Sequence, residues 1–409
     1  MALPIQIHLL PAREGDCLLI SVGPDWHLLV DTGYRATYTD YLKPLLQELA
    51  AAGKQLSHCI ITHIDADHIS GAVEGLFPEN QGADQPQVIP IGQVWHNSYR
   101  HLALPAEPVA EQLPSADQAI LRSLISRGAA AISNGQPSSP QPISGRQGSV
   151  LGSLLLKHRY AWNTDAGQSA IVAPLAVQLG PGVRCQLLSP VAVGLRRLAG
   201  SWERELTKMG FASQLRSGAL FDDAYEFWQL ADKTTPVPSI QPIGASSPAS
   251  PMHYRQTLFT EDTSRTNGSS IAILLEADGR RMLLLGDAHP SVILQELRRV
   301  LAAEAAPWWF DCIKLSHHGS FANNSPELLE ATDSDCYLFS TDGGKHHHPD
   351  PATLSWVVTR PLTRPGQVRK ICCNYLTPNV QLFARADWQD QYHYTLSIAP
   401  DGQPLIVSL

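Results

Sequence analysis

The chain has 409 residues, 44% of them hydrophobic, and a formal net charge of −8. This length suits one large domain or two domains with an apolar core. No run of lysine and arginine occurs, which argues against tight nonspecific DNA binding but allows a local groove. The seven cysteines lack zinc-finger spacing, so we expect reduced thiols. Because neither a signal segment nor a long apolar run is present, we expect a cytoplasmic protein that makes no contact with membranes.

The first third of the chain predicts short strands that end in polar turns. Strands are expected over residues 5–10, 17–22 and 27–30, followed by a helix over 38–53. The third strand runs into Asp31-Thr32-Gly33, a pattern typical of a sharp turn at an active site. Asp31 is a candidate acceptor behind a metal-binding histidine, and it could equally cap the turn backbone.

Two histidines and two aspartates fall within six residues, at His63, Asp65, Asp67 and His68. They follow an apolar run at 58–61 that predicts a buried strand, and a helix is expected to begin near 69–71. The four side chains would therefore lie on a strand-to-helix turn, where a rigid scaffold can aim them at one point. Nitrogen and oxygen ligands of this kind suit zinc, manganese or iron. A capped turn with incidental histidines is the weaker interpretation.

The middle of the chain contains fewer signals of chemistry. A strand over 88–96 leads into Asn97, a candidate side chain for lining a site. A helix is predicted over 115–132, a loop over 133–149, a strand over 183–189 and helices within 192–232. Residues 234–252 are rich in proline and serine. We expect a single domain over 1–409, with insertions at about 100–170 and 195–260.

In the second half, further strands end in metal-binding residue types. A hairpin at Asp278-Gly279 leads to a strand that ends at Asp287, and a helix is expected over 290–302. The strand over 311–315 ends at His317 and His318, and the strand over 336–340 precedes three histidines at 346–348. Of these three, His348 is favoured because the following proline constrains its backbone. Four strand ends of this kind predict an α/β fold with one polar centre at the carboxyl ends of its strands.

In this order, the motifs resemble the metallo-β-lactamase superfamily, and more narrowly its ComEC-type branch. In that branch, aspartate replaces the second histidine of the usual His-x-His-x-Asp-His motif, as Asp65 does here. The branch also has an Asn-x-x-Ser strand start (Asn267 and Ser270), a His-His-Gly-Ser turn (317–320) and a final Gly-His-Pro. The resemblance covers residues 5–75 and 265–350, and it implies an αββα sandwich.

The chain departs from the superfamily pattern in two further places. No histidine follows the mid-chain strand, which ends at Leu188-Ser189-Pro190, and the glycine is missing before His348-Pro349. With Asp65 in a histidine position, the first metal site becomes rich in oxygen. The expected cofactors are therefore two divalent ions, zinc or manganese. One of His317, His318 or His348 would supply the missing ligand.

The resemblance suggests a role for each residue. His63 and Asp65 would hold one metal, Asp67 and His68 with a late histidine would hold the second, and Asp287 would bridge them. Asp67 would also orient the attacking water, and a spare histidine, His317, His318 or His348, would donate a proton to the leaving group. Asn267 and Ser320 are candidate substrate donors, with turn capping as their alternative role.

The function that these roles predict is a phosphodiesterase or nuclease that acts on DNA, RNA or nucleotides through a metal-activated water. Stand-alone members of the branch occur beside antiphage defence genes, so the resemblance also suggests that role. The first alternative is hydrolysis of a lactone, thioester or lactam on the same metals. The second is a metal-stabilised sensor or adaptor without catalysis, in which the insertions would dock a protein partner.

Overall fold

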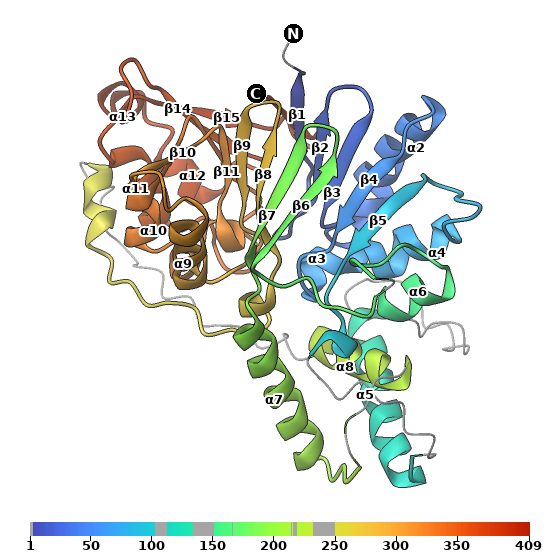
Figure 1. The fold of residues 1–409 in the computed structure, drawn as a ribbon. Coiled ribbons are helices and arrows are strands. Elements are labelled where there is room, and N and C mark those ends of the chain that lie inside the picture. Colours follow the sequence, from blue (N-terminus) through green and yellow to red (C-terminus); the bar gives the residue numbers. More distant parts are fainter. Residues whose placement is uncertain are drawn as a thin grey trace.

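Two β-sheets pack face to face, and helices cover the outer face of each (Figure 1). The structure, a computed structural model, describes residues 3–102, 113–133, 151–165, 167–213, 215, 219–231 and 250–409. The layers follow the order helix, sheet, sheet, helix, which confirms the expected αββα sandwich. No helix in these described ranges is both long and apolar enough to cross a bilayer.

The first sheet has the strand order β16-β1-β2-β3-β4-β5. Strands β1 to β3 pair antiparallel, and β3, β4 and β5 run parallel. The predicted strands of the first hundred residues are all present, with ends within a few residues of those expected. Their bounds are Ile5–Leu9 for β1, Leu18–Val22 for β2, Trp26–Val30 for β3, Leu56–Ile60 for β4, Ile91–Trp95 for β5 and Leu405–Ser408 for β16.

The second sheet has the order β15-β14-β13-β11-β9-β8-β7-β6, and its strands β9, β11, β13, β14 and β15 run parallel. Asp278-Gly279 makes the predicted hairpin between β8 and β9. A separate two-stranded sheet joins β10 and β12. The bounds are Leu175–Gly180 (β6), Val183–Ser189 (β7), Ala272–Ala277 (β8), Arg280–Leu284 (β9), Trp308–Phe310 (β10), Cys312–Lys314 (β11), Thr332–Ser334 (β12), Cys336–Phe339 (β13), Arg369–Cys373 (β14) and Tyr394–Ile398 (β15).

Three hydrophobic clusters fill the spaces between the layers. The central cluster lies between the sheets, and the other two lie between each sheet and its helices. Strand β3 illustrates the division, because Leu28 and Val30 belong to the central cluster and Leu29 to an outer one. Successive side chains of a strand point to opposite faces, so a fully apolar strand serves two cores. All seven cysteines are buried free thiols, as expected.

The helices beside the first sheet contain two π-type turns. Helix α1 (Arg35–Thr37) and α2 (Lys43–Ala51) flank a π-type turn at Tyr38–Leu42, which confirms the helix expected over 38–53. Helix α3 (Ala66–Gly71) continues through a second π-type turn (Ala72–Leu76) into α4 (Phe77–Asn80). Pro78 lies within this helical run. Proline is tolerated there because it occupies the first turn of a new helical segment.

Accessory helices from the middle of the chain lie at one end of the sandwich, at the bottom of Figure 1, except α6, which lies beside α4. They are α5 (Ser115–Ser133), α6 (Leu151–Lys157), α7 (Ala192–Lys208) and α8 (Ala219–Ala231). The loop predicted over 133–149 and most of the Pro/Ser-rich stretch over 234–252 lie outside the described residues. The division into one domain with two insertions stays a prediction.

The helices beside the second sheet include several that the sequence analysis did not predict. Helices α9 (Pro290–Val300) and α10 (Pro326–Ala331) match the expected positions. Helices α11 (Pro351–Thr359), α12 (Pro378–Leu382) and α13 (Ala386–Tyr392) lie in a region for which no element was predicted, as do β14 to β16.

A buried ion pair connects β12 of the two-stranded sheet to β14 of the second sheet. The guanidinium of Arg369, at the start of β14, donates to both carboxylate oxygens of Asp333 in β12, over 3.1 Å each. Both residues have no solvent exposure. Tyr337 and Thr363 donate further hydrogen bonds to the same carboxylate, over 3.0 and 2.6 Å. Asp333 therefore satisfies a charge that would otherwise lie unpaired in the core.

Replacing Asp333 by alanine should destabilise the fold by about 3–5 kcal/mol, because Arg369 would keep its buried charge without a partner. Urea unfolding followed by circular dichroism measures the change. Glu327→Ala is the matched control, since Glu327 pairs with Arg298 in an exposed contact and should cost less than about 1 kcal/mol. Equal losses in both variants would contradict this assignment.

Candidate metal centre

Four strand ends bring their polar residues to one place between the sheets. The turn after β4 carries His63, Asp65, Asp67 and His68, β9 is followed by Asp287, β11 by His317 and His318, and β13 by the loop with His348. The first strand belongs to one sheet and the other three to the second sheet. The centre therefore forms only when the two sheets pack together.

The turn after β4 is shaped by close backbone contacts. Asp65 has extended backbone angles and immediately precedes α3, so Asp67 and His68 lie in the first helical turn. The backbone N–H of Asp16 donates to the Asp67 carbonyl over 3.2 Å. A side chain at Gly15 would approach that carbonyl oxygen to 2.0 Å, so only glycine fits beside the turn.

Asp287 lies at the middle of the centre. Its Oδ2 is 3.4 Å from His68 Nε2 and 3.6 Å from His63 Nε2. The same oxygen is 3.8 Å from His317 Nε2 and 3.9 Å from His318 Nε2. One buried carboxylate thus faces four imidazoles, each contributed through its Nε2 atom.

The remaining carboxylates approach different histidines of the centre. Asp65 Oδ2 lies 3.4 Å from His63 Nε2. Asp67 Oδ2 lies 3.2 Å from His318 Nε2 and 3.6 Å from His68 Nε2. The assignment of these residues to two metals stays a prediction. Among the late histidines, His318 is the one that approaches Asp67.

Asp31 supports His68 from behind. Its Oδ2 accepts from His68 Nδ1 over 2.8 Å, which directs Nε2 toward Asp287. The same carboxylate accepts from the backbone N–H and the hydroxyl of Thr62, over 2.7 and 2.8 Å. Asp31 therefore both caps the turn and orients the histidine, the two roles considered for it.

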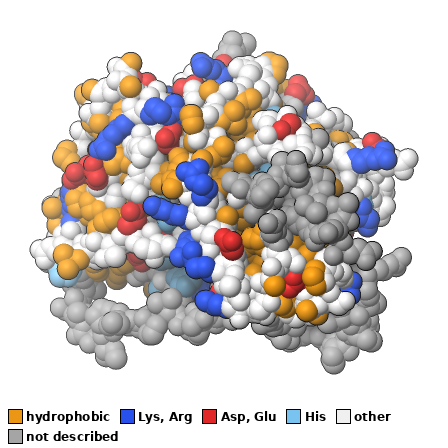
Figure 2. Space-filling model, turned by 60° about the horizontal axis from the view of Figure 1, so that its bottom comes forward, with side chains coloured by type: hydrophobic (Ala, Val, Ile, Leu, Met, Phe, Trp, Pro, Cys, Tyr) orange, Lys and Arg blue, Asp and Glu red, His pale blue; other side chains and the backbone are white. Residues whose placement is uncertain are grey.

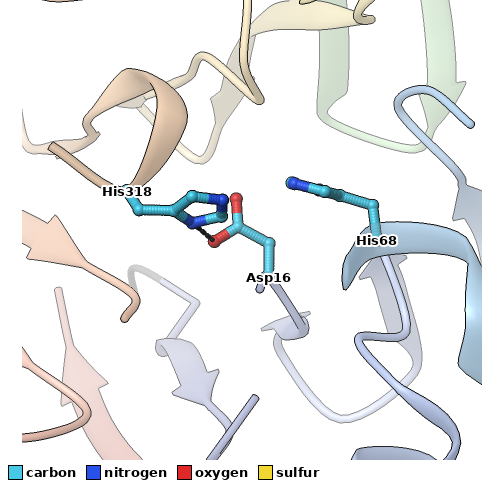
Figure 3. Close-up of side chains that lie close together, drawn as sticks. All are labelled: Asp16, His68 and His318. Atoms are coloured by element: carbon cyan, nitrogen blue, oxygen red, sulfur yellow. Dashed lines mark ion pairs between the residues drawn. The ribbon is translucent and has the colours of Figure 1, made fainter. Parts of the chain in front are cut away.

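Asp16 plays a similar part beside His318 and was missed by the sequence analysis. Figure 3 shows Asp16 beside the His318 ring, with His68 across from them. Asp16 Oδ1 lies 3.3 Å from His318 Nδ1, which also donates to the Ser340 carbonyl over 2.9 Å. Lys314 pairs with the other oxygen of Asp16 over 2.6 Å, deep in the protein. No local signal in the sequence indicates that Asp16 would meet residue 318.

The donor set fits a divalent cation. Three overlapping groups of residues each offer ligand atoms that lie within 4.8 Å of one another. The groups are Asp16, His68 and His318; His63, His68 and Asp287; and Asp287, His317 and His318. Nε2 of His68 and Oδ1 of Asp287 are buried and have no hydrogen-bond partner among the described residues. Buried polar atoms are normally satisfied, so a cation coordinated by imidazole and carboxylate would complete this site.

Charges within the centre shift the pKa values of its members. Burial lowers the pKa of His68, but Asp287, Asp67 and Asp31 together raise it well above the ordinary histidine value. Burial likewise opposes protonation of His318, yet Asp287, Asp16 and Asp67 raise its pKa to about 9. Burial and the neighbouring His348 lower the pKa of His317 to about 4, although Asp287 opposes them. Without metal, His68 and His318 therefore carry protons at the positions where cations would bind.

A cavity of about 260 Å³ opens onto the centre. His348 lies at its wall, with Nδ1 3.2 Å from Asp350 Oδ1. The residues that line it are all of polar types and come from both halves of the chain: Glu14, Asp65, Asp67, Asp262, Ser264, Asn267, Asp287, His317, His318, Thr341, Lys345, His346 and His348.

Of the three predicted substrate-binding residues, only Asn267 lines this cavity. Its Nδ2 donates to Asp262 Oδ2 over 2.7 Å. Ser320 is buried, and its backbone N–H closes a turn onto the His317 carbonyl. The amide side chain of Asn97 bonds to both the N–H and the carbonyl of Ile171, so it bridges two segments away from the cavity.

Asn323 is a second residue that the sequence analysis missed. Its Oδ1 accepts from His317 Nδ1 over 2.8 Å, and its Nδ2 donates to the Asp287 carbonyl over 3.1 Å. Asp262 also accepts from Asn323 Nδ2, over 3.0 Å. These bonds fix the His317 ring, which emerges from a backbone with a φ of 45°.

The metal-free protein should lose stability as the pH rises from 6.5 to 9. The pKa of His318 is about 9 in the folded chain and about 6.5 in the unfolded chain. The stability that protonation of His318 contributes is therefore fully present below pH 6.5 and is lost as the pH rises through 9. The loss should be on the order of 3 kcal/mol, measured by urea unfolding in chelator. His318→Gln should show a flatter profile, and a flat profile for the unaltered chain would contradict the prediction.

Asp31→Asn should weaken binding of Zn²⁺ or Mn²⁺ roughly 10–100-fold, because His68 would lose the acceptor that orients it. Competition against a chromophoric chelator measures this affinity. Asp25→Asn makes the same chemical change at an exposed residue and should leave the affinity unaltered. If both variants bind metal equally, Asp31 does not support a metal ligand.

The comparisons with known proteins agree with this geometry. Residues 10–77 match the family model described as the metallo-beta-lactamase superfamily. The matched segment contains β2, β3, β4 and the turn with His63, Asp65, Asp67 and His68. A search of curated proteins gave no match. The matched segment and the αββα arrangement of the two sheets are both similar to the metallo-β-lactamase superfamily.

Proposed function

We propose that this chain is a phosphodiesterase or nuclease that uses two divalent metal ions. The superfamily consists mostly of hydrolytic enzymes, and the His and Asp groups described above could hold a metal. The observation that carries the proposal is the position of Asp287, whose carboxylate oxygen faces histidines from two different strand ends. A paired centre suits phosphodiester hydrolysis, in which charge develops on both the attacking and the leaving oxygen.

In this proposal, two sets of ligands, one in each half of the centre, would hold the two cations. His63, Asp65 and Asp287 offer one imidazole and two carboxylates. His68, His318, Asp67 and Asp287 offer two imidazoles and two carboxylates. The first half is richer in oxygen, which favours manganese there over a pure zinc site. A bound divalent ion supplies Lewis acidity toward water and toward phosphoryl oxygens.

The chain's own residues would position the water and the leaving group. Burial opposes ionisation of Asp67, but His68 and His318 hold its pKa well below the ordinary value, so it is a carboxylate that can accept a hydrogen bond from the attacking water. His317 is neutral at pH 7 and donates its Nδ1 proton to Asn323, which leaves Nε2 as an acceptor or a ligand. His348 is thus the better candidate to donate a proton to the leaving oxygen, with Asp350 fixing its ring.

The ComEC-type motifs support a nucleic acid or nucleotide as the substrate. Asn267, which the resemblance assigns to this branch, lines the cavity beside His317 and Asp287. Lys345 and His346 line its rim and would offer hydrogen-bond donors to phosphoryl oxygens. A role in antiphage defence would follow from such an activity and is part of the proposal.

The purified chain should hydrolyse bis-p-nitrophenyl phosphate and labelled single-stranded DNA or RNA when Mn²⁺ or Zn²⁺ is added. Asp67→Asn should lower kcat roughly 10²- to 10⁴-fold, because the water would lose its acceptor. Asp84→Asn is the matched control, since Asp84 is exposed and does not line the cavity.

Two outcomes would favour the alternatives. Activity on lactones, thioesters or lactams but on no phosphodiester would assign the centre to acyl transfer. Metal binding without turnover of any of these substrates, with biological activity retained in Asp67→Asn, would favour the sensor or adaptor role.

A further inference from the structure

A second hollow, of about 330 Å³, lies next to the cavity of the metal centre. Helix α8 contributes Trp228 to it, and α7 contributes Leu198, Ser201, Arg204, Glu205 and Lys208. The segment 263–266 forms the remaining wall. Ser264 lines both this hollow and the metal-centre cavity, so the two spaces adjoin along this segment.

The hollow is basic although the whole chain carries a net charge of −8. Arg265 donates to the Ser201 hydroxyl, and Arg204 Nη2 lies 3.4 Å from the same oxygen. The two guanidinium groups thus converge on one small side chain. In the described part of the chain, neither forms an ion pair with a carboxylate. Lys208 pairs with Glu205 over 3.0 Å, but its side chain remains 72% exposed.

Figure 2 brings the lower face of the molecule forward and shows Lys and Arg side chains gathered along its middle. Helix α7 carries Arg196, Arg197, Arg204 and Lys208 against Glu203 and Glu205. Trp228 adds a half-buried ring to the hollow, and it packs against the buried Trp202 with ring centroids 5.0 Å apart. Cationic side chains beside an aromatic ring are the features with which proteins hold single strands without reading their sequence.

We propose that this hollow binds the backbone of a single-stranded nucleic acid whose scissile phosphodiester lies in the metal centre. The inference rests on the proposed function and adds the substrate's second point of contact. Asp262 lines the centre and Arg265 lines the hollow, and three residues of chain span at most about 11 Å. Phosphates a few nucleotides from the cleaved bond would therefore reach Arg204, Lys208 and Arg265.

The acidic rim of the metal centre makes this second contact necessary. Glu14, Asp262 and the carboxylates of the centre repel a polyanion, and only part of that charge is offset by bound cations. A basic hollow at one side would hold the strand and would favour oligonucleotides over small phosphodiesters. The remote contact supplies binding energy that a short substrate cannot use.

Fluorescence anisotropy with a labelled single strand of about 12 nucleotides, as DNA and as RNA, tests the proposal. Arg204→Gln/Lys208→Gln should raise Kd about tenfold at 0.1 M salt and should reduce the slope of log K against log salt by about 1.4, for two lost phosphate contacts. Arg196→Gln/Arg197→Gln is the matched control, because it removes the same charge from exposed positions of α7 outside the hollow. That control should change Kd less than twofold.

Equal weakening in the two double variants would mean that only general charge matters and would overturn the proposal, as would unchanged binding in both. Circular dichroism checks that both variants fold. In turnover, the ratio of kcat/KM for the oligonucleotide to that for bis-p-nitrophenyl phosphate should fall about tenfold in Arg204→Gln/Lys208→Gln. If the unaltered chain cleaves neither substrate, the proposed function fails, while anisotropy still decides whether the hollow binds the strand.

Discussion

The rest of the structure depends on the carboxylate of Asp287, which lies buried among four imidazoles. A buried carboxylate is costly unless positive charge or hydrogen bonds compensate it. Here the compensation comes from histidines on one strand end of the first sheet and one of the second. The two sheets must therefore pack in one relative position for the centre to form. This constraint joins the fold and the chemistry in a single requirement.

Surrounding acceptors hold three of these imidazoles in place. Asp31 accepts from His68, Asn323 from His317, and the Ser340 carbonyl from His318. In each case Nδ1 is occupied by the protein, which leaves Nε2 to face the centre. Lys314 neutralises Asp16 at the back of the site, so the charge beside His318 is balanced within the core. The ligand atoms are thus positioned before any metal binds.

The accessory helices give this otherwise acidic molecule a local basic surface. The cationic side chains of α7 and Arg265 lie beside the metal-centre cavity. The short segment 263–266 separates the two spaces. An acidic net charge limits nonspecific association with polyanions, whereas a local basic hollow restores attraction where a substrate must lie. Global and local charge can thus serve opposite purposes in one chain.

The sequence by itself determined the strand ends and the residue types that follow them. Apolar runs that stop at polar residues are local signals. They predicted the candidate residues of the turn over 63–68, and also Asp287 and His318. It could not determine that Asp16 meets His318, that Asn323 holds His317, or that Asn97 bonds to Ile171, since these contacts join segments far apart in the chain. It also missed the elements after residue 350. Only the packing of one sheet on the other decided which of the late histidines approaches Asp67, because distances between sheets are not encoded in the spacing of residues along a strand.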